Sequence, residues 1–421
     1  MKATLGKVIG IILVLALLPL VAAAATSYIT PWYANPALRS RTYLNANAFT
    51  PVDLKVGADG ERVVVVTSGG PATNLRVFDA QTLDRTGSVA LTNIHLSARS
   101  TSSLGVGATP RLAARGHDLL CIDSGNGAVA DISLESRRWA GRYAPDARTF
   151  SAAPDATSFA LDSEGALWSN ATGAGRSGLI VKRSLSGSAY VEVDTVDTGL
   201  AAVDAMAVYA VNGTNYAFAA AQGKVVRVNL STKAVATLVD DTAHLDDAVA
   251  VVRMSHTDYF RPRLYVLLVT GDVAVYYLDE EATTASWSKT VTNESLLDIV
   301  QCPYGHDATI CAFDVRPDGG AAYFGYRPTD GAVATGPCYV ATVRNYPPRW
   351  IYYAKGSAGN PSTESATYNC ITDGKWVLRC DVSGKNISIG VGTQNEANCG
   401  NAWDGDYMGE LARAPKASCF K

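Results

Sequence analysis

The chain has 421 residues, a formal net charge of −3, 48% hydrophobic residues and 18% charged residues. This composition excludes a disordered chain, and the low charge argues against the basic surface that nucleic-acid binding requires. The length fits two or three average domains, or one large β domain with an appendage.

Residues 1–25 have the layout of a secretory signal peptide. Two lysines form a short basic region, an unbroken apolar run covers 8–21, and alanines follow at 22–25. This order predicts cleavage after Ala24 or Ala25 and a secreted, extracellular protein with no stable membrane span after cleavage. The alternative is a membrane anchor that is not cleaved, although the run is shorter than the roughly 20 residues that a spanning helix needs.

Residues 26–50 form an N-terminal arm rich in Pro, Asn and aromatic residues. From residue 51 onward, helical periodicity is nearly absent. Short runs of Val, Ala, Leu and Tyr alternate with polar residues and are broken by Gly, Asp and Asn. This pattern predicts many short strands joined by tight turns, four of them within 54–91. We expect the arm to run along this array and help close it.

A turn signal recurs along the chain at intervals of about 50 residues. It appears at Asp59-Gly60, His117-Asp118, Glu164-Gly165, Asn212-Gly213, Asp318-Gly319 and Asp373-Gly374, and Arg261-Pro262-Arg263 holds the expected place between the fourth and fifth of these. A four-stranded unit cannot hide both of its faces alone, so repeated units are expected to close into a ring. The sequence therefore predicts an all-β fold, a β-propeller of about six blades over residues 51–356, with seven blades as an alternative.

The strand segments also resemble a known kind of repeat. Residues 63–67 and 75–79 (VVVVT and LRVFD), 160–168 (ALDSEGALW) and 312–323 (AFDVRPDGGAAY) resemble β-propeller repeats of the YVTN and NHL kind. The resemblance covers about residues 50–350 and implies a fold rather than a substrate, because propellers serve as binders, scaffolds and enzymes.

Residues 357–421 follow a proline-rich break and are predicted to form a small β module. A stretch this short rarely builds a sufficient core, and disulfides would offset that deficit. The alternative is a seventh blade, since Asp373-Gly374 falls on the repeat period.

The chain has eight cysteines, an even number that favours disulfides in an exported protein. Cys121 stands apart, whereas seven cysteines follow residue 300. The predicted disulfide cysteines are Cys302, Cys311, Cys338, Cys370, Cys380, Cys399 and Cys419. The spacing does not determine which cysteines pair with each other. The sequence contains no CxxC motif, so a zinc site is not indicated.

Five triplets match the acceptor pattern for N-linked glycans, which a secreted glycoprotein would carry. The acceptor residues are Asn170, Asn212, Asn229, Asn293 and Asn386.

The search for catalytic motifs is negative, and no catalytic residue is predicted. The sequence contains no nucleophile elbow, HExxH motif, P-loop or EF-hand loop. His117, His256 and His306 are interpreted as structural or exposed rather than as catalytic bases. Asp240-Asp241 and Asp246-Asp247, which bracket His244, fit a solvated loop better than a calcium loop.

Four aspartates begin predicted blades at similar repeat positions, and their side chains would converge if all of them faced the channel. These are Asp53, Asp162, Asp204 and Asp314. Carboxylate oxygens suit Ca²⁺, so this set is the predicted metal site, and no other cofactor is expected.

Aromatic clusters outside the blade pattern mark a second predicted site. Trp350, Tyr352 and Tyr353 form a predicted surface for a sugar or protein. Trp32, Tyr33 and Trp403 also lie in such clusters, and packing of the N-terminal arm against the ring is the plainer explanation for the clusters as a whole.

Together these observations favour a secreted interaction or scaffold module that binds an extracellular protein or glycan and not nucleic acid. One alternative is a calcium-assisted propeller hydrolase or lactonase. A second alternative is a structural subunit of an extracellular coat or fibre.

Overall fold

The structure, a computed structural model, describes most of the region from residue 31 to residue 345 and four later strands. The described residues are 31–34, 36–44, 50–57, 60, 62–68, 74–80, 82–83, 85–90, 111–115, 118–123, 128–133, 148–150, 156–171, 173–187, 189–257, 260–329, 338–345, 353–355, 365–372, 376–383 and 386–391. The predicted signal peptide, His117, Trp350, Tyr352 and Trp403 lie outside these residues.

The chain divides into two compact units. One unit spans Pro31–Asn345, and the other combines Met1–Thr30 with Tyr346–Lys421. The first unit includes residues 31–50 of the predicted N-terminal arm and ends where the sequence reaches the proline-rich break at residues 346–350.

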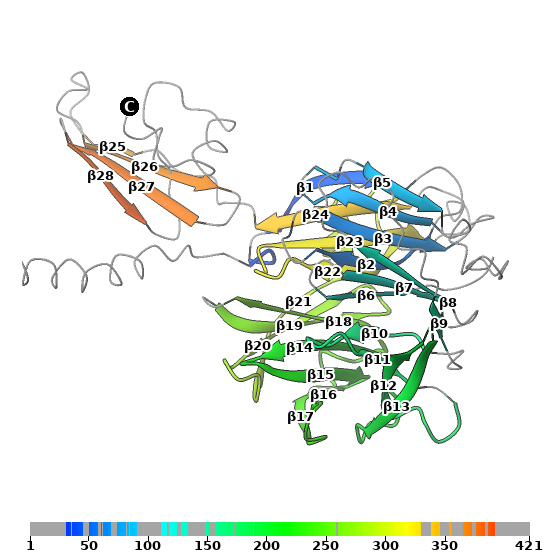
Figure 1. The fold of residues 1–421 in the computed structure, drawn as a ribbon. Helices are drawn as coiled ribbons and strands as arrows, with labels where there is room; N and C mark the ends of the chain where they lie inside the picture. The colour runs from blue at the N-terminus through cyan, green and yellow to red at the C-terminus, as the bar shows by residue number, and fades with distance from the viewer. Residues whose placement is uncertain are drawn as a thin grey trace, which may run out of the picture. The chain divides into compact units, whose positions relative to one another are not determined.

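The first unit is built from antiparallel strands that follow one another along the chain (Figure 1). Three sheets have four consecutive strands each: β2 (Thr50–Val56), β3 (Arg62–Ser68), β4 (Asn74–Asp79) and β5 (Arg85–Ala90); β14 (Ala205–Val211), β15 (Thr214–Ala221), β16 (Lys224–Asn229) and β17 (Val235–Asp240); and β18 (Val249–Thr257), β19 (Phe260–Leu268), β20 (Val273–Leu278) and β21 (Ala285–Val291).

A fourth sheet has eight strands. They are β6 (Arg111–Arg115), β7 (Asp118–Asp123), β8 (Ala128–Ser133), β9 (Arg148–Phe150), β10 (Phe159–Leu161), β11 (Leu167–Asn170), β12 (Leu179–Ser186) and β13 (Ala189–Asp197). This sheet consists of two four-strand repeats, which join because β13 pairs in parallel with β9.

The fifth sheet contains strands from both ends of the unit. Its order is β1-β24-β23-β22, built from β1 (Pro36–Tyr43), β22 (Ala308–Val315), β23 (Ala321–Pro328) and β24 (Tyr339–Asn345). The arm therefore supplies the outermost strand of the last blade, and this pairing closes the ring as expected for the arm.

The first strands of the repeats form the inner wall of the ring. Contacts link β2 to β6, β6 to β10, β10 to β14, β14 to β18, β18 to β22 and β22 back to β2. This closed circle establishes the β-propeller. The prediction of about six blades is corrected, because the described residues of the propeller form five hydrogen-bonded blade sheets, one of which holds two of the predicted repeats.

The middle strands are apolar on both faces because each blade lies between two others. In β3, Val63, Val64, Val65 and Val66 are all fully buried. A strand covered on both faces is expected to have a continuous apolar run rather than an alternating one. The valine run that marked this repeat in the sequence thus follows from its place inside the ring.

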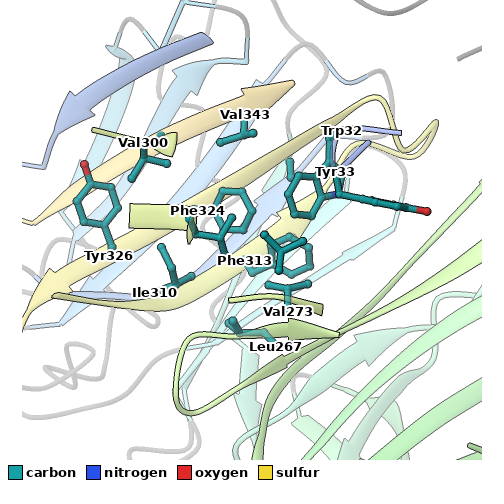
Figure 2. Close-up of a cluster of buried hydrophobic side chains, with 14 of the residues drawn as sticks. Trp32, Tyr33, Leu267, Val273, Val300, Ile310, Phe313, Phe324, Tyr326 and Val343 are labelled. Atoms are coloured by element: carbon teal, nitrogen blue, oxygen red, sulfur yellow. The ribbon is translucent and has the colours of Figure 1, made fainter. Parts of the chain in front are cut away.

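The start of the arm packs into the core between the blades of β18–β21 and β22–β24 (Figure 2). Trp32 is fully buried, and its ring centroid lies 5.3 Å from Phe324 and 5.7 Å from Tyr33. Tyr265 and Phe313 complete the aromatic surroundings of Trp32. Packing of the arm is therefore the correct explanation for Trp32 and Tyr33.

The described part of the propeller includes a short helix that the sequence analysis did not anticipate. Helix α2 spans Asn293–Ile299, and the hydroxyl of Thr292 caps it by accepting a hydrogen bond from the Ser295 N–H. Leu296 and Leu297 are buried against the aromatic core. The helix is too short for its periodicity to be read from the sequence.

The second unit contains one described sheet. It consists of β25 (Tyr353–Lys355), β26 (Ser365–Thr372), β27 (Trp376–Ser383) and β28 (Asn386–Val391). The register places Cys370 opposite Leu378 and Cys380 opposite Tyr368, so it does not align two cysteines. Cys399 and Cys419 lie outside the described residues. The described residues therefore give no support to a disulfide-bonded module.

Among the residues that the structure places, no helix is both long enough and apolar enough to cross a membrane.

Candidate functional site

The centre of the propeller contains a buried network of ion pairs. Arg253 extends from β18 and reaches carboxylates on two other blades. Its Nη2 lies 3.2 Å from an oxygen of Asp53 on β2, and its Nε lies 2.9 Å from an oxygen of Asp314 on β22. All three side chains are almost completely buried. Burial lowers the pKa of Arg253, but Asp314 and Asp53 outweigh that effect and raise it above its ordinary value.

Three of the four predicted metal ligands instead connect neighbouring inner strands. Asp53 accepts a hydrogen bond from the Leu112 N–H at 2.8 Å, and Asp314 accepts one from the Val56 N–H at 2.7 Å. Asp204 accepts one from the Val249 N–H at 3.2 Å. These three aspartates, which the sequence placed at similar positions in their repeats, therefore connect neighbouring blades of the ring.

Asp162 has a different role in the turn between β10 and β11. Its carboxylate accepts hydrogen bonds from the Glu164 and Ala166 N–H groups at 3.0 and 2.8 Å. It also accepts the indole N–H of the buried Trp168 at 3.0 Å. Asp162 therefore stabilises both the turn at 162–166 and the buried tryptophan that follows it.

The predicted metal site is not assembled in this geometry. Within the described ranges, no group of three or more His, Cys, Asp and Glu side chains is arranged to hold a metal ion. The physical reason is that backbone N–H groups, Arg253 and Trp168 already occupy the oxygens that a cation would need.

We expect chelation of divalent cations to leave the melting temperature unchanged, because the carboxylates are stabilised by protein donors.

Asp162→Ala, in contrast, should reduce the free energy of unfolding by about 1–3 kcal/mol, since it leaves the buried Trp168 N–H without its acceptor. Thermal and urea unfolding, with and without EDTA, would measure both effects. Asp197→Ala, at the exposed end of β13, is the control. A wild-type melting temperature that falls on chelation would contradict this prediction.

Two cavities lie in the channel and meet at Lys55. The larger has a volume of about 380 Å³, and Lys55, Ala160, Asp162, Tyr209 and Asp314 are among its lining residues. The smaller has a volume of about 280 Å³ and is lined in part by Asp53, Arg111, Asp204 and Arg253. Lys55 lines both cavities.

Lys55 is electrostatically unusual. Burial, followed by the nearby charge of Arg253, lowers its pKa to about 8, and Asp53 and Asp314 only partly oppose this change. Across the part of the chain that the structure describes, no hydrogen bond or ion pair holds the amine. The sequence analysis did not single out Lys55 or Arg253. The sequence feature that could have indicated Lys55 is a positively charged residue within a strand segment that is otherwise largely apolar.

The predicted disulfides of the propeller are corrected. Cys302, Cys311 and Cys338 are free thiols. The Cys311 thiol donates instead toward the Pro51 carbonyl at 3.2 Å. Burial raises the pKa of Cys311 to about 12 and that of Cys338 to about 11, so both remain protonated and unreactive near neutral pH.

The predicted glycan acceptors differ in accessibility. Asn170 is fully buried, and its amide oxygen accepts hydrogen bonds from the Thr157 and Ser158 N–H groups. This residue is not an accessible acceptor in the folded protein. Asn212 is exposed, and Asn229 and Asn293 are partly exposed. For Asn386 the structure describes only the backbone, in β28.

The outer rim of the propeller exposes an ordered aromatic residue. Trp287 on β21 is 46% exposed, and its ring stacks on His244 with a centroid distance of 4.2 Å and an interplanar angle of 16°. The Nδ1 atom of His244 lies 2.8 Å from a carboxylate oxygen of Asp241. That oxygen also accepts a hydrogen bond from Tyr276 at 3.0 Å. The loop interpreted as solvated therefore holds His244 against Trp287.

The other predicted histidines and aromatics do not join this cluster in the described structure. His306 is exposed and contacts Asp298 at 3.0 Å, which raises its pKa, while only the backbone of His256 is described, in β18. Of the predicted aromatic binding surface, Trp350 and Tyr352 lie outside the described residues, and Tyr353 is placed only as the first residue of β25.

Comparisons with known proteins add structural neighbours only. No family model matches the chain, and no curated protein matches it. The RRP9 WD40 repeats are 11% identical, cover 75% of this chain and 100% of their own, and give a TM-score of 0.47. A chain of the mitotic checkpoint complex is 13% identical, with coverages of 77% and 93% and a TM-score of 0.42.

A putative 6-phosphogluconolactonase from Bacteroides uniformis is 14% identical, with coverages of 68% and 82% and a TM-score of 0.40. These low scores carry no functional argument, and the propeller assignment rests on the strand topology. The structure supports the propeller fold that the resemblance to YVTN and NHL repeats implied. It does not identify the repeats as that particular type.

Proposed function

We propose that the chain is a secreted interaction module, and that the surface around Trp287 binds an extracellular protein. The observation that supports this proposal is an exposed tryptophan whose orientation is fixed by the stacked His244 ring. Tryptophan is enriched among the residues that dominate binding energy at interfaces. A side chain that is ordered before binding loses less conformational entropy when a partner arrives.

Other repeats also expose single apolar side chains on the rim. Tyr43, Val193 and Val235 are exposed, and each lies on the outermost strand of its repeat, as Trp287 does. The alternative of a calcium-assisted hydrolase or lactonase has less support, because the channel carboxylates already bond to protein groups. Secretion is inferred from the pattern of residues 1–25.

A bait experiment tests this proposal. Wild-type protein, Trp287→Ala and Leu185→Ala would be immobilised and incubated with the medium of the producing cells, and retained molecules quantified by mass spectrometry. Leu185 is the matched control, because it is 43% exposed and lies on another repeat. We expect a partner that wild type and Leu185→Ala retain equally and that Trp287→Ala retains about tenfold less, the size of an interface hot spot.

Two results would contradict the proposal: equal retention by all three proteins, or no retained partner. Loss of retention after the partner is deglycosylated would instead identify a glycan as the recognised group.

A further inference from the structure

The exposed Trp287 ring is held by a series of contacts that ends at a carboxylate. The His244 ring stacks on the indole with a centroid distance of 4.2 Å and an interplanar angle of 16°. At the edge of the imidazole, the Nδ1 atom lies 2.8 Å from an oxygen of Asp241. Tyr276 on β20 donates a hydrogen bond to the same oxygen at 3.0 Å. The imidazole is therefore fixed by Asp241 at its edge and by Trp287 at its face.

These contacts leave the second ring nitrogen of His244 open to protonation. A carboxylate only accepts hydrogen bonds, so the Nδ1 atom carries the proton that faces Asp241. Among the residues that the structure describes, none forms a hydrogen bond with the Nε2 atom, and the His244 side chain is 33% exposed. A proton from solvent therefore reaches Nε2 without any rearrangement of the surrounding side chains.

The loop 241–248 and the strands beside it carry the titratable and charged groups around His244. They are Asp241, Asp246 and Asp247 of the loop, Lys224 and Arg227 of β16, Asp240 of β17, Tyr276 of β20, Glu280 and Glu281 of the turn before β21, and Lys289 of β21. Lys224 pairs with Asp240 at 3.4 Å, and the Arg227 guanidinium donates to the Glu281 carbonyl. Histidine is the side chain whose charge ordinarily changes between about pH 5 and pH 8.

The two groups nearest the imidazole keep their own protonation state over this range. Burial raises the pKa of Asp241, but the hydrogen bonds from His244 and Tyr276 outweigh burial and lower it, so the carboxylate stays ionised. Burial, followed by the charge of Asp241, raises the pKa of Tyr276, so the hydroxyl stays protonated. A positive charge that forms on His244 therefore meets a carboxylate at its edge and an aromatic ring at its face.

We propose that His244 makes the surface around Trp287 pH-responsive, so that an extracellular partner is held more tightly in mildly acidic medium. This inference rests on the proposed binding function of that surface. A cation over an aromatic face is attracted by the ring, which at an exposed site corresponds to a factor of about two to five. The gain in partner affinity is limited to the same factor, because protonation acts only by raising the population of the ordered indole.

A double-mutant cycle measures the coupling between His244 and Trp287 without any partner. Wild type, His244→Gln, Trp287→Leu and the double variant would be unfolded in urea at about pH 5.5 and about pH 8. We expect the coupling, expressed as a ratio of unfolding equilibrium constants, to be about two- to fivefold larger at the lower pH. The cycle cancels the pH dependence of the remaining titratable groups, because all four proteins share it.

His306→Gln is the matched control for the loss of a histidine beside a carboxylate. His306 lies 3.0 Å from Asp298, but in the described structure its ring stacks on no aromatic side chain. A second cycle with His306→Gln and Trp287→Leu should therefore show no coupling at either pH. A coupling between His244 and Trp287 that is absent, or that is equal at the two pH values, would overturn the inference.

The bait experiment, repeated at the two pH values, separates this inference from the proposed function. We expect wild type to retain more partner than His244→Gln at about pH 5.5 and a similar amount at about pH 8. Retention that depends on Trp287 but shows no such difference would support the proposed function and contradict this inference. If no partner were retained, the proposed function would fail, and the coupling measured in the cycle would still decide whether protonation of His244 acts on Trp287.

Discussion

Replacing Arg253 with Met is expected to reduce the free energy of unfolding by about 3–5 kcal/mol, the cost of removing one partner from a buried ion pair. The substitution leaves the Asp53 and Asp314 carboxylates buried without their cation, although both retain their backbone hydrogen bonds. It also removes a contact among three blades, since the residues lie on β18, β2 and β22. Urea denaturation followed by circular dichroism would measure the loss.

The matched control is Arg176→Met. Arg176 contacts Glu192 at 2.7 Å, but both side chains are substantially exposed, and we expect a loss below about 1 kcal/mol. Arg253→Lys keeps a positive charge without the planar fork that reaches two carboxylates, so an intermediate loss is expected. Similar small losses for Arg253→Met and Arg176→Met would show that the central ion pairs do not hold the ring together.

Trp32→Ala is expected to destabilise the propeller by about 3–5 kcal/mol, because it creates a cavity where the arm packs against two blades. Trp32 is fully buried among Tyr33, Phe313 and Phe324 (Figure 2), and its ring also contacts Tyr265. The lost packing should also loosen β1, the strand that completes the last blade. Urea denaturation would measure the stability, and limited proteolysis the release of the arm.

Trp287→Ala provides the same chemical change at an exposed site. We expect it to cost less than about 1 kcal/mol and to leave the arm protected from proteolysis. Equal destabilisation by the two substitutions, or an arm that stays protected in Trp32→Ala, would contradict the role of Trp32 in closing the ring.

Local patterns in the sequence were sufficient to predict the propeller. The turn signal seen at Asp318-Gly319 recurs at intervals of about one blade, and it falls where the structure has a turn, while the valine run at 63–66 falls in a strand. Gly319 has a φ of +71°, a backbone conformation that favours glycine. Such signals depend on a few neighbouring residues, so a single sequence carries them.

Side-chain partners were not predictable in the same way. The aspartates at the starts of the inner strands could equally be ligands for a cation or acceptors for the next blade, because the same carboxylate serves both purposes. Whether Asp53 binds a cation or a protein group depends on Arg253, which lies about 200 residues away in the chain. The cysteine pairing was also not predictable from the sequence. An even number of cysteines favoured disulfides, but a disulfide forms only where two cysteines lie close together in the fold. Cys302, Cys311 and Cys338 have no such neighbour and are free.

The sequence by itself therefore determined that the chain builds repeated antiparallel strands and turns that must close on themselves, because strand alternation and turn chemistry are local properties. Only the tertiary structure decided that two repeats share one sheet, that the arm closes the last blade, and that Lys55 lies without a protein partner between two channel cavities. Each of these outcomes depends on contacts between residues far apart in the chain, whose distances and burial are set only when the ring closes.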